Sequence, residues 1–161
     1  LLVSPLKPLQ IVVGKVFPYL LLAFINAVTT LVVAWIVFRV PINGSLFLLL
    51  ACSLLYVLVA LALGVLISTK APDQRSAMLT TLLGLLLPTL VLSGFIFPIA
   101  SMPGWLQPVT NIVPATWFIV IVRGIMLKGA GLLVLRQELL ILVGMAAILL
   151  IVSARNFPDR I

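Results

Sequence analysis

The segment LFLLLACSLLYVLVALALGVLI, residues 46–67, contains no charged side chain. An α-helix needs about 20 apolar residues to cross the ~30 Å of hydrocarbon in a bilayer. This segment therefore predicts a transmembrane helix. The same criterion selects residues 17–38, 77–97 and 139–154, so the predicted fold is all-α and polytopic, with four transmembrane helices.

The composition agrees with a membrane protein. Hydrophobic residues make up 64% of the 161 residues and charged residues 8%, and the mean hydropathy is +1.40. Soluble domains carry about 25% charged residues, because they must cover their surface with polar groups. Since the chain begins at Leu1 and shows no signal-peptide pattern, we expect residues 1–161 to be a single transmembrane domain and a piece of a longer protein.

The positive charge predicts how the chain is oriented. The net charge is +7, and the Lys and Arg residues lie singly between apolar blocks, which favours a topological role over nucleic-acid binding. Residues 1–16, 70–76 and 155–161 are short and basic, so we expect this side to be cytoplasmic, with both ends of the chain inside. Residues 1–16 contain two prolines and cannot span, which predicts a cytoplasmic interfacial segment.

Residues 99–131 do not have the pattern of a polar loop. The stretch SGFIFPIASMPGWLQP, residues 93–108, contains three prolines, and Trp105 is typical of the headgroup level. The apolar run that ends at Lys128 is too short to cross, and Arg123 at mid-bilayer would cost about 2.5–3.5 kcal/mol on insertion scales. We therefore expect a re-entrant helical hairpin on the outer side over residues 99–131.

The chain is poorly supplied with catalytic groups. Asp73, Glu138 and Asp159 are its only acids and lie far apart in the sequence; it has no histidine and one cysteine, Cys52. GIMLKGAG, residues 124–131, lacks the Lys-Ser/Thr pair of a phosphate loop. We expect no catalytic residue, no metal site and no cofactor bound by this chain.

Polar or helix-breaking residues in the apolar segments each have two interpretations. Asn26, Thr29 and Thr30 share one helix face, and either bond to a neighbouring helix or line a transport path. Pro88 is either a static kink or a hinge. Arg123 either reaches headgroups and carbonyl groups or contacts an anionic substrate. The translocation-path candidates are Asn26, Thr29, Thr30, Pro88, Ser93 and Arg123.

Four blocks resemble a known family in the same order along the chain. They are LLVSPLKPLQIVVGK (residues 1–15), LGVLIST (63–69), LSGFIFPIASMPGWLQ (92–107) and RGIMLKG (123–129). Together they resemble the C-terminal portion of the ABC type-2 permeases, the membrane subunits of bacterial ATP-driven exporters of the multidrug and daunorubicin-resistance type. The resemblance implies spans three to six of a six-span permease, working as two permeases with two ATPase subunits.

The expected function is the permease subunit of an exporter that moves hydrophobic or amphipathic, drug- or lipid-like substrates out across the bacterial inner membrane. The expected partners are an ABC ATPase subunit that binds ATP, a second permease copy or paralogue, and the lipid bilayer, with no nucleic acid. A non-transporting membrane anchor and a gradient-driven carrier remain alternatives. The candidates for coupling to the ATPase are Ser4, Pro5, Lys7, Pro8 and Lys15.

Overall fold

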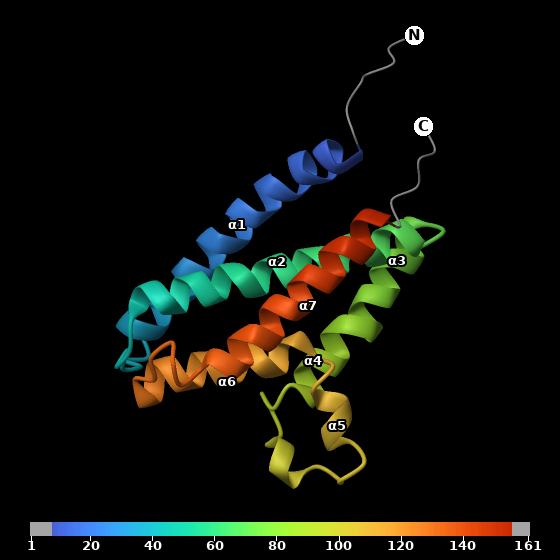
Figure 1. Ribbon diagram of the computed structural model, residues 1–161. Helices are drawn as coiled ribbons and strands as arrows, with labels where there is room; N and C mark the ends of the chain where they lie inside the picture. The colour runs from blue at the N-terminus through green and yellow to red at the C-terminus, as the bar shows by residue number, and fades with distance from the viewer. Residues whose placement is uncertain (1–7, 156–161) are drawn as a thin grey trace.

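A computed structural model of the chain describes residues 8–155, and within this range the secondary structure is helical, with no strand. Four helical segments are long and apolar enough to cross a membrane, which confirms the all-α fold with four spans. They are α1 (Pro8–Ile36), α2 (Leu46–Lys70), the consecutive α3 (Gln74–Thr81) and α4 (Leu87–Leu92), and α7 (Arg136–Arg155) (Figure 1).

The region between α4 and α7 contains shorter elements. A 3-10 turn covers Ile99–Ser101, and two helices follow, α5 (Gln107–Thr110) and α6 (Pro114–Lys128). A π-helical turn, Leu82–Leu86, joins α3 to α4 without a break in the helix. The third span is therefore one helix built from three differently wound pieces.

The helix boundaries differ from the sequence prediction, most clearly for the first and third spans. Residues 8–16, expected as a separate interfacial segment, continue into the first span as one helix, which ends at Ile36 and not at residue 38. The third span ends at Leu92 and not at residue 97, because Gly94 has a φ of +79°, a left-handed conformation that ends helices. Residues 95–97 remain apolar, so hydropathy alone gave no sign of this end.

Helix α2 is the centre of the bundle. Its main contacts are with α7, α1 and α6, and the core contains Leu49 and Val59 of α2, Ile121 and Ile125 of α6, and Leu142 of α7. All five side chains are fully buried. The short α6 therefore packs as part of the bundle and is not a surface loop.

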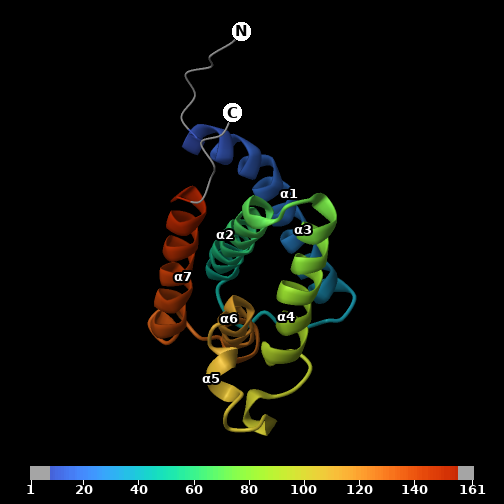
Figure 2. The same ribbon diagram turned by 90° about the vertical axis from the view of Figure 1, so that its right-hand side faces the viewer.

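The helix ends gather at two opposite poles. The start of α1, the turn between α2 and α3, and the end of α7 lie together at one pole (Figures 1 and 2). The end of α6 lies at the other pole, against the α1–α2 loop: the Asn43 backbone N–H donates to the Met126 carbonyl at 3.1 Å, and its side-chain amide donates to the Leu127 carbonyl at 3.1 Å.

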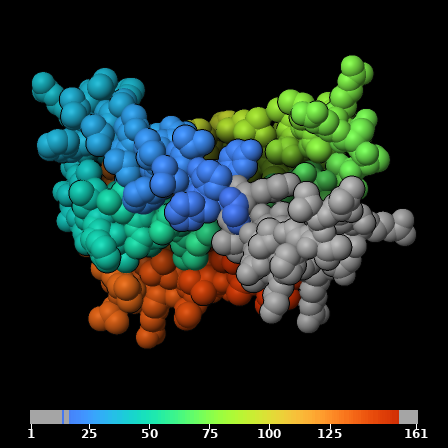
Figure 3. All heavy atoms as spheres, turned by 90° about the horizontal axis from the view of Figure 1, so that it is seen from above, coloured from blue at the N-terminus to red at the C-terminus, as the bar shows by residue number. Residues whose placement is uncertain are grey.

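Much of the bundle's outer surface is apolar. No residue is buried inside the structure in the part of α1 that covers Phe17–Ile36, or in the third span, Gln74–Leu92. Seen from above, α1 and α3 lie on opposite sides of the molecule (Figure 3). Such surfaces suit a multi-pass protein, because lipid chains solvate apolar side chains as well as a protein core does.

The contact between the α1–α2 loop and α6 predicts a sensitive glycine. A Cβ on Gly44 would lie 2.6 Å from the carbonyl oxygen of Ile125, a backbone atom that cannot rotate away. We expect Gly44→Ala to destabilise the purified protein by about 1–3 kcal/mol through overpacking. Gly131→Ala is the matched control, because a Cβ there meets nothing within 4 Å. Equal thermal midpoints for the two variants would contradict the close packing.

The turn between α2 and α3 predicts a pH-dependent helix cap. The side chain and the backbone N–H of Ser76 hydrogen-bond to the Asp73 carboxylate, which lowers the pKa of Asp73. A lowered pKa means that the cap acts at neutral pH and is lost as the pH falls through that value. We expect Asp73→Ala to speed amide hydrogen exchange at Ser76 several-fold at neutral pH. Asp73→Asn, which keeps the acceptor oxygen, should stay close to the parent protein and lose the acid dependence.

Candidate functional site

An apolar groove of about 750 Å³ lies between α2, the third span, the start of α6 and α7. It is bounded by Tyr56, Val59, Ala60 and Leu63 of α2 and by Met145, Ile148 and Leu149 of α7. The rest of its lining is Thr81, Gly84, Leu85, Leu86, Pro88, Thr89 and Leu92 of the third span, and Val109, Ile112, Val113, Pro114 and Ala115 around the start of α6. We call this space the apolar groove.

The chemistry of the apolar groove is that of a site for apolar molecules. Its polar side chains are Tyr56, Thr81 and Thr89, and its lining contains no carboxylate, lysine or arginine. The ring of Tyr56 stacks on Phe118 with centroids 4.3 Å apart, which fixes one wall. The volume lies within the ~300–1,000 Å³ typical of small-molecule sites, whose linings are mostly apolar.

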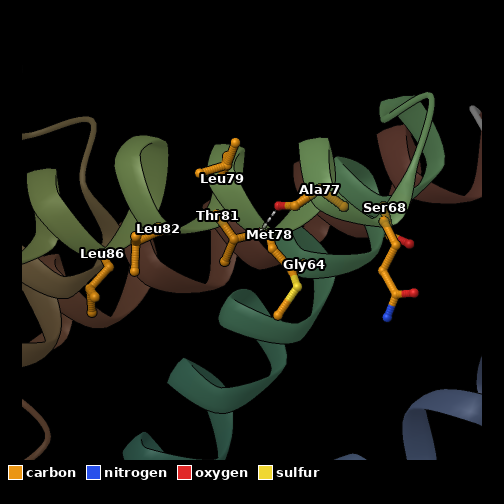
Figure 4. Close-up of a pocket in the computed structure, with 9 residues that line it drawn as sticks. Gly64, Ser68, Ala77, Met78, Leu79, Thr81, Leu82 and Leu86 are labelled. Atoms are coloured by element: carbon orange, nitrogen blue, oxygen red, sulfur yellow. Dashed lines mark hydrogen bonds between the residues drawn. The ribbon is translucent and has the colours of Figure 1, made fainter.

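A second, smaller pocket of about 560 Å³ lies between the end of α2 and the third span. Figure 4 shows Met78, Leu82 and Leu86 pointing to the same side of their helix, with Gly64 and Ser68 of α2 across from them. The hydroxyl of Thr81 donates to the Ala77 carbonyl at 2.8 Å and so stays within its own helix. This pocket is close to the pole that carries the α2–α3 turn.

The elbow between α5 and α6 is held together by side chains that donate to its carbonyl groups. The Thr116 hydroxyl donates to the Thr110 carbonyl at 2.7 Å, and the Trp117 indole N–H donates to the Asn111 carbonyl at 2.9 Å. The Thr110 hydroxyl donates in turn to the Gln107 carbonyl at 2.7 Å. Backbone outside regular helix is tolerated at membrane depth only when its polar groups are satisfied or line a cavity, and the elbow meets this condition.

Helix α6 runs from the middle of α2 toward its start. Pro114 and Ala115 share the apolar groove with Tyr56, whereas the last carbonyl groups of α6 bond to Asn43, just before α2. The ten α2 residues between the α1–α2 loop and Tyr56 correspond to about 15 Å of helix. The elbow therefore lies about half a hydrocarbon thickness away from the α1–α2 loop, measured along α2.

Among the predicted coupling residues, Ser4, Pro5 and Lys7 lie outside the described residues. Pro8 is the first residue of α1, and Lys15 lies within this helix. The pole at which α1 starts also carries the α2–α3 turn. The role of these five residues stays a prediction.

The polar stripe of α1 lies away from the apolar groove. Asn26, Thr29 and Thr30 are exposed and are not part of its lining. The hydroxyl groups of Thr29 and Thr30 each donate to a carbonyl one turn earlier in α1, at 2.8 Å. The two hydroxyl groups are thus satisfied within their own helix, and the structure does not bring the stripe together with the other candidates.

Of the other three candidates, Pro88 lies at the start of α4, and Ser93 and Arg123 lie near its end. Pro88 lines the apolar groove, and Ser93 follows the last residue of α4. Arg123 of α6 donates from Nη2 to the Gly94 carbonyl at 3.3 Å. The side chain of Ser93 is 1% exposed, and its hydroxyl finds no hydrogen-bond partner among the described residues. Leaving a buried hydroxyl without a partner costs about 1–3 kcal/mol.

Sequence reasoning missed most of the groove lining. Residues such as Ala60, Ala115 and Met145 look like ordinary helix-packing residues, and no local pattern separates a groove wall from a lipid-facing side. Tyr56 carried the one available signal, because it is the only residue with an aromatic hydroxyl in residues 46–67. In the part of the chain that the structure describes, no group of three or more His, Cys, Asp or Glu residues could hold a metal ion.

Comparison with known proteins places this arrangement in a family. Residues 1–127 match the family described as ABC-2 type transporter. The chain is 34% identical over 146 residues to the probable multidrug ABC transporter permease YbhS of Escherichia coli, an alignment that covers 91% of this chain and 39% of that protein. It is 36% identical over 132 residues to the probable multidrug ABC transporter permease YbhR of the same organism, covering 82% of this chain and 36% of that protein.

A eukaryotic protein is also similar. ABC transporter G family member 20 of Dictyostelium discoideum is 35% identical over 123 residues, which cover 76% of this chain and 17% of that protein. The chain spans well under half the length of each of these relatives, and no solved structure gives a significant match. The match over residues 1–127 and the four apolar spans lead to one conclusion: this chain is a multi-pass membrane protein that belongs to the ABC-2 type transporter family of permeases.

Proposed function

We propose that the chain is the membrane-spanning part of the permease subunit of an ATP-driven exporter, moving hydrophobic or amphipathic, drug- or lipid-like molecules. The apolar groove carries this proposal, because its volume and uncharged lining suit such a molecule and exclude strong binding of a bare ion. The names of two relatives, which call them probable multidrug permeases, support the same class of substrate.

The energy for transport comes from a separate ATPase subunit. The 161 residues contain no phosphate loop, which fits ATP hydrolysis on a partner subunit. The segment around Ser4, Pro5, Lys7, Pro8 and Lys15 is the candidate contact with that subunit. A second permease copy or paralogue completes the membrane unit.

In the proposed orientation, the pole with the start of α1 and the α2–α3 turn faces the cytoplasm of the bacterial inner membrane. Lys70 and Arg75 flank that turn, and loops rich in Lys and Arg stay inside. The α5–α6 elbow then enters the outer half of the bilayer and returns, as the predicted re-entrant hairpin does. Two observations support this placement: the satisfied carbonyl groups of the elbow, and the short length of α6.

Two alternative functions make different demands on the same site. A gradient-driven carrier needs a titratable relay in the membrane, and neither Asp73 nor Glu138 lines the apolar groove. A non-transporting anchor needs no groove. A reconstituted transport assay therefore distinguishes the exporter from both alternatives.

Filling the apolar groove should block transport without unfolding the protein. We expect Ala60→Trp, in the full permease reconstituted with its ATPase, to lower ATP-dependent efflux of a hydrophobic fluorescent dye roughly tenfold. A loss of about 1.4 kcal/mol in dye binding, caused by the indole in the groove, lowers the affinity for the dye tenfold. Leu140→Trp is the matched control, since Leu140 is 70% exposed and lies outside the lining.

The control reactions decide between the functions. A catalytically dead ATPase should abolish efflux. Efflux that continues at full rate with the dead ATPase would indicate a gradient-driven carrier. Absence of efflux under every condition, from a folded complex, would favour the anchor.

A further inference from the structure

Among the four spans, the third makes the fewest contacts with the rest of the bundle. Its principal contacts are with α2 near the α2–α3 turn and with α6 near the end of α4. No residue between Gln74 and Leu92 is buried, yet this span supplies more of the groove lining than any other element. A displacement of its outer half would therefore widen the apolar groove without breaking the core around α2.

The span contains a mechanical irregularity at its middle. Pro88 has no N–H to bond, and its ring would clash with the carbonyl of Gly84 in a regular α-helix. The turn before it, Leu82–Leu86, is π-helical, and the Leu87 N–H donates five residues back, to the Leu82 carbonyl. Wide turns of this kind occur mostly as single-turn bulges, often at functional sites. The helix is thus bonded more loosely at Gly84–Pro88 than above or below it.

The outer end of the span is held by one charged contact. The exposed Arg123 guanidinium donates to the carbonyl of Gly94, two residues past α4, at 3.3 Å, slightly longer than is usual for such bonds. Gly94 itself is buried with a positive φ, and a Cβ there would meet Ile99 at 3.2 Å. Next to it, the buried Ser93 hydroxyl has no partner among residues 8–155, so this arrangement leaves one polar group unsatisfied.

From these observations we propose that Arg123 is a positioning residue that holds the outer end of α4 against α6 and keeps the apolar groove narrow. When this bond breaks, α4 swings outward about the π-helical turn Leu82–Leu86 and Pro88, and the groove widens. The role of this motion in transport rests on the proposed function. The motion itself involves only residues of this chain.

The test measures groove access in the full permease in lipid nanodiscs, without ATPase and without transport. Cys52, the single native cysteine, is replaced by alanine, and Thr89→Cys reports from the groove wall. The measurement is the rate of labelling by a water-soluble maleimide. We expect Arg123→Ala to raise this rate roughly fivefold, the factor expected for loss of one hydrogen bond of ordinary net strength. Arg123→Lys, which keeps a charged donor, should restore most of the slow labelling.

The hinge is tested by stiffening it. Pro88→Ala restores an N–H that can bond to the Gly84 carbonyl, and Gly84→Ala adds a Cβ that meets only Thr80 Cγ2, at 3.9 Å. Because Pro88→Ala can also rotate α4 relative to α3, Gly84→Ala is the second, milder variant. We expect either change, combined with Arg123→Ala, to return the labelling rate of Thr89→Cys toward that of the parent.

The control position is Leu133→Cys, in the loop before α7, where the native side chain is 81% exposed. Its labelling should be equal in all backgrounds. The proposal is overturned if Arg123→Ala leaves Thr89→Cys labelling unchanged in a monodisperse protein, or if the stiffened variants label as fast as Arg123→Ala alone. Failure of ATP-dependent efflux would count against the proposed function. It would not affect the conclusion that the labelling rates give about the motion of α4.

Discussion

Every peptide N–H and C=O group inside a bilayer must find its partner within the protein, and the whole architecture follows from this requirement. The four spans meet it by helix formation. Where regular helix stops at the α5–α6 elbow, side chains take over, because Thr116 and Trp117 donate to its carbonyl groups. Asn43 does the same for the end of α6.

The same requirement explains why the groove exists. Pro88 removes one helical hydrogen bond from the third span. In the adjoining π-helical turn, the Leu87 N–H donates to the Leu82 carbonyl, five residues back instead of four. The span leaves α2 after their shared turn and meets the bundle again only where α4 approaches α6. Between these two contacts the helices stand apart, and apolar side chains line the space.

An apolar space in a lipid-facing protein is chemically close to the bilayer itself, which suits it for molecules that partition into membranes. In the proposed function, selectivity would come from shape and from a few polar groups, here Tyr56, Thr81 and Thr89. Arg123 of α6 is exposed and donates to the backbone carbonyl of Gly94. This bond partly satisfies the guanidinium of an arginine that lies in an otherwise apolar helix.

The sequence by itself determined the membrane class, the four spans and the family resemblance, and it marked Pro88 and Arg123 as unusual residues within apolar segments. Each of these depends on hydropathy, on proline chemistry or on the cost of a charge in hydrocarbon, which are local properties. Only the tertiary structure decided which faces enclose a groove, that the polar stripe of α1 lies away from it, and that the third span ends at Leu92. The physical reason is that lipid and protein interior are equally apolar, so composition cannot tell a residue that faces one from a residue that faces the other.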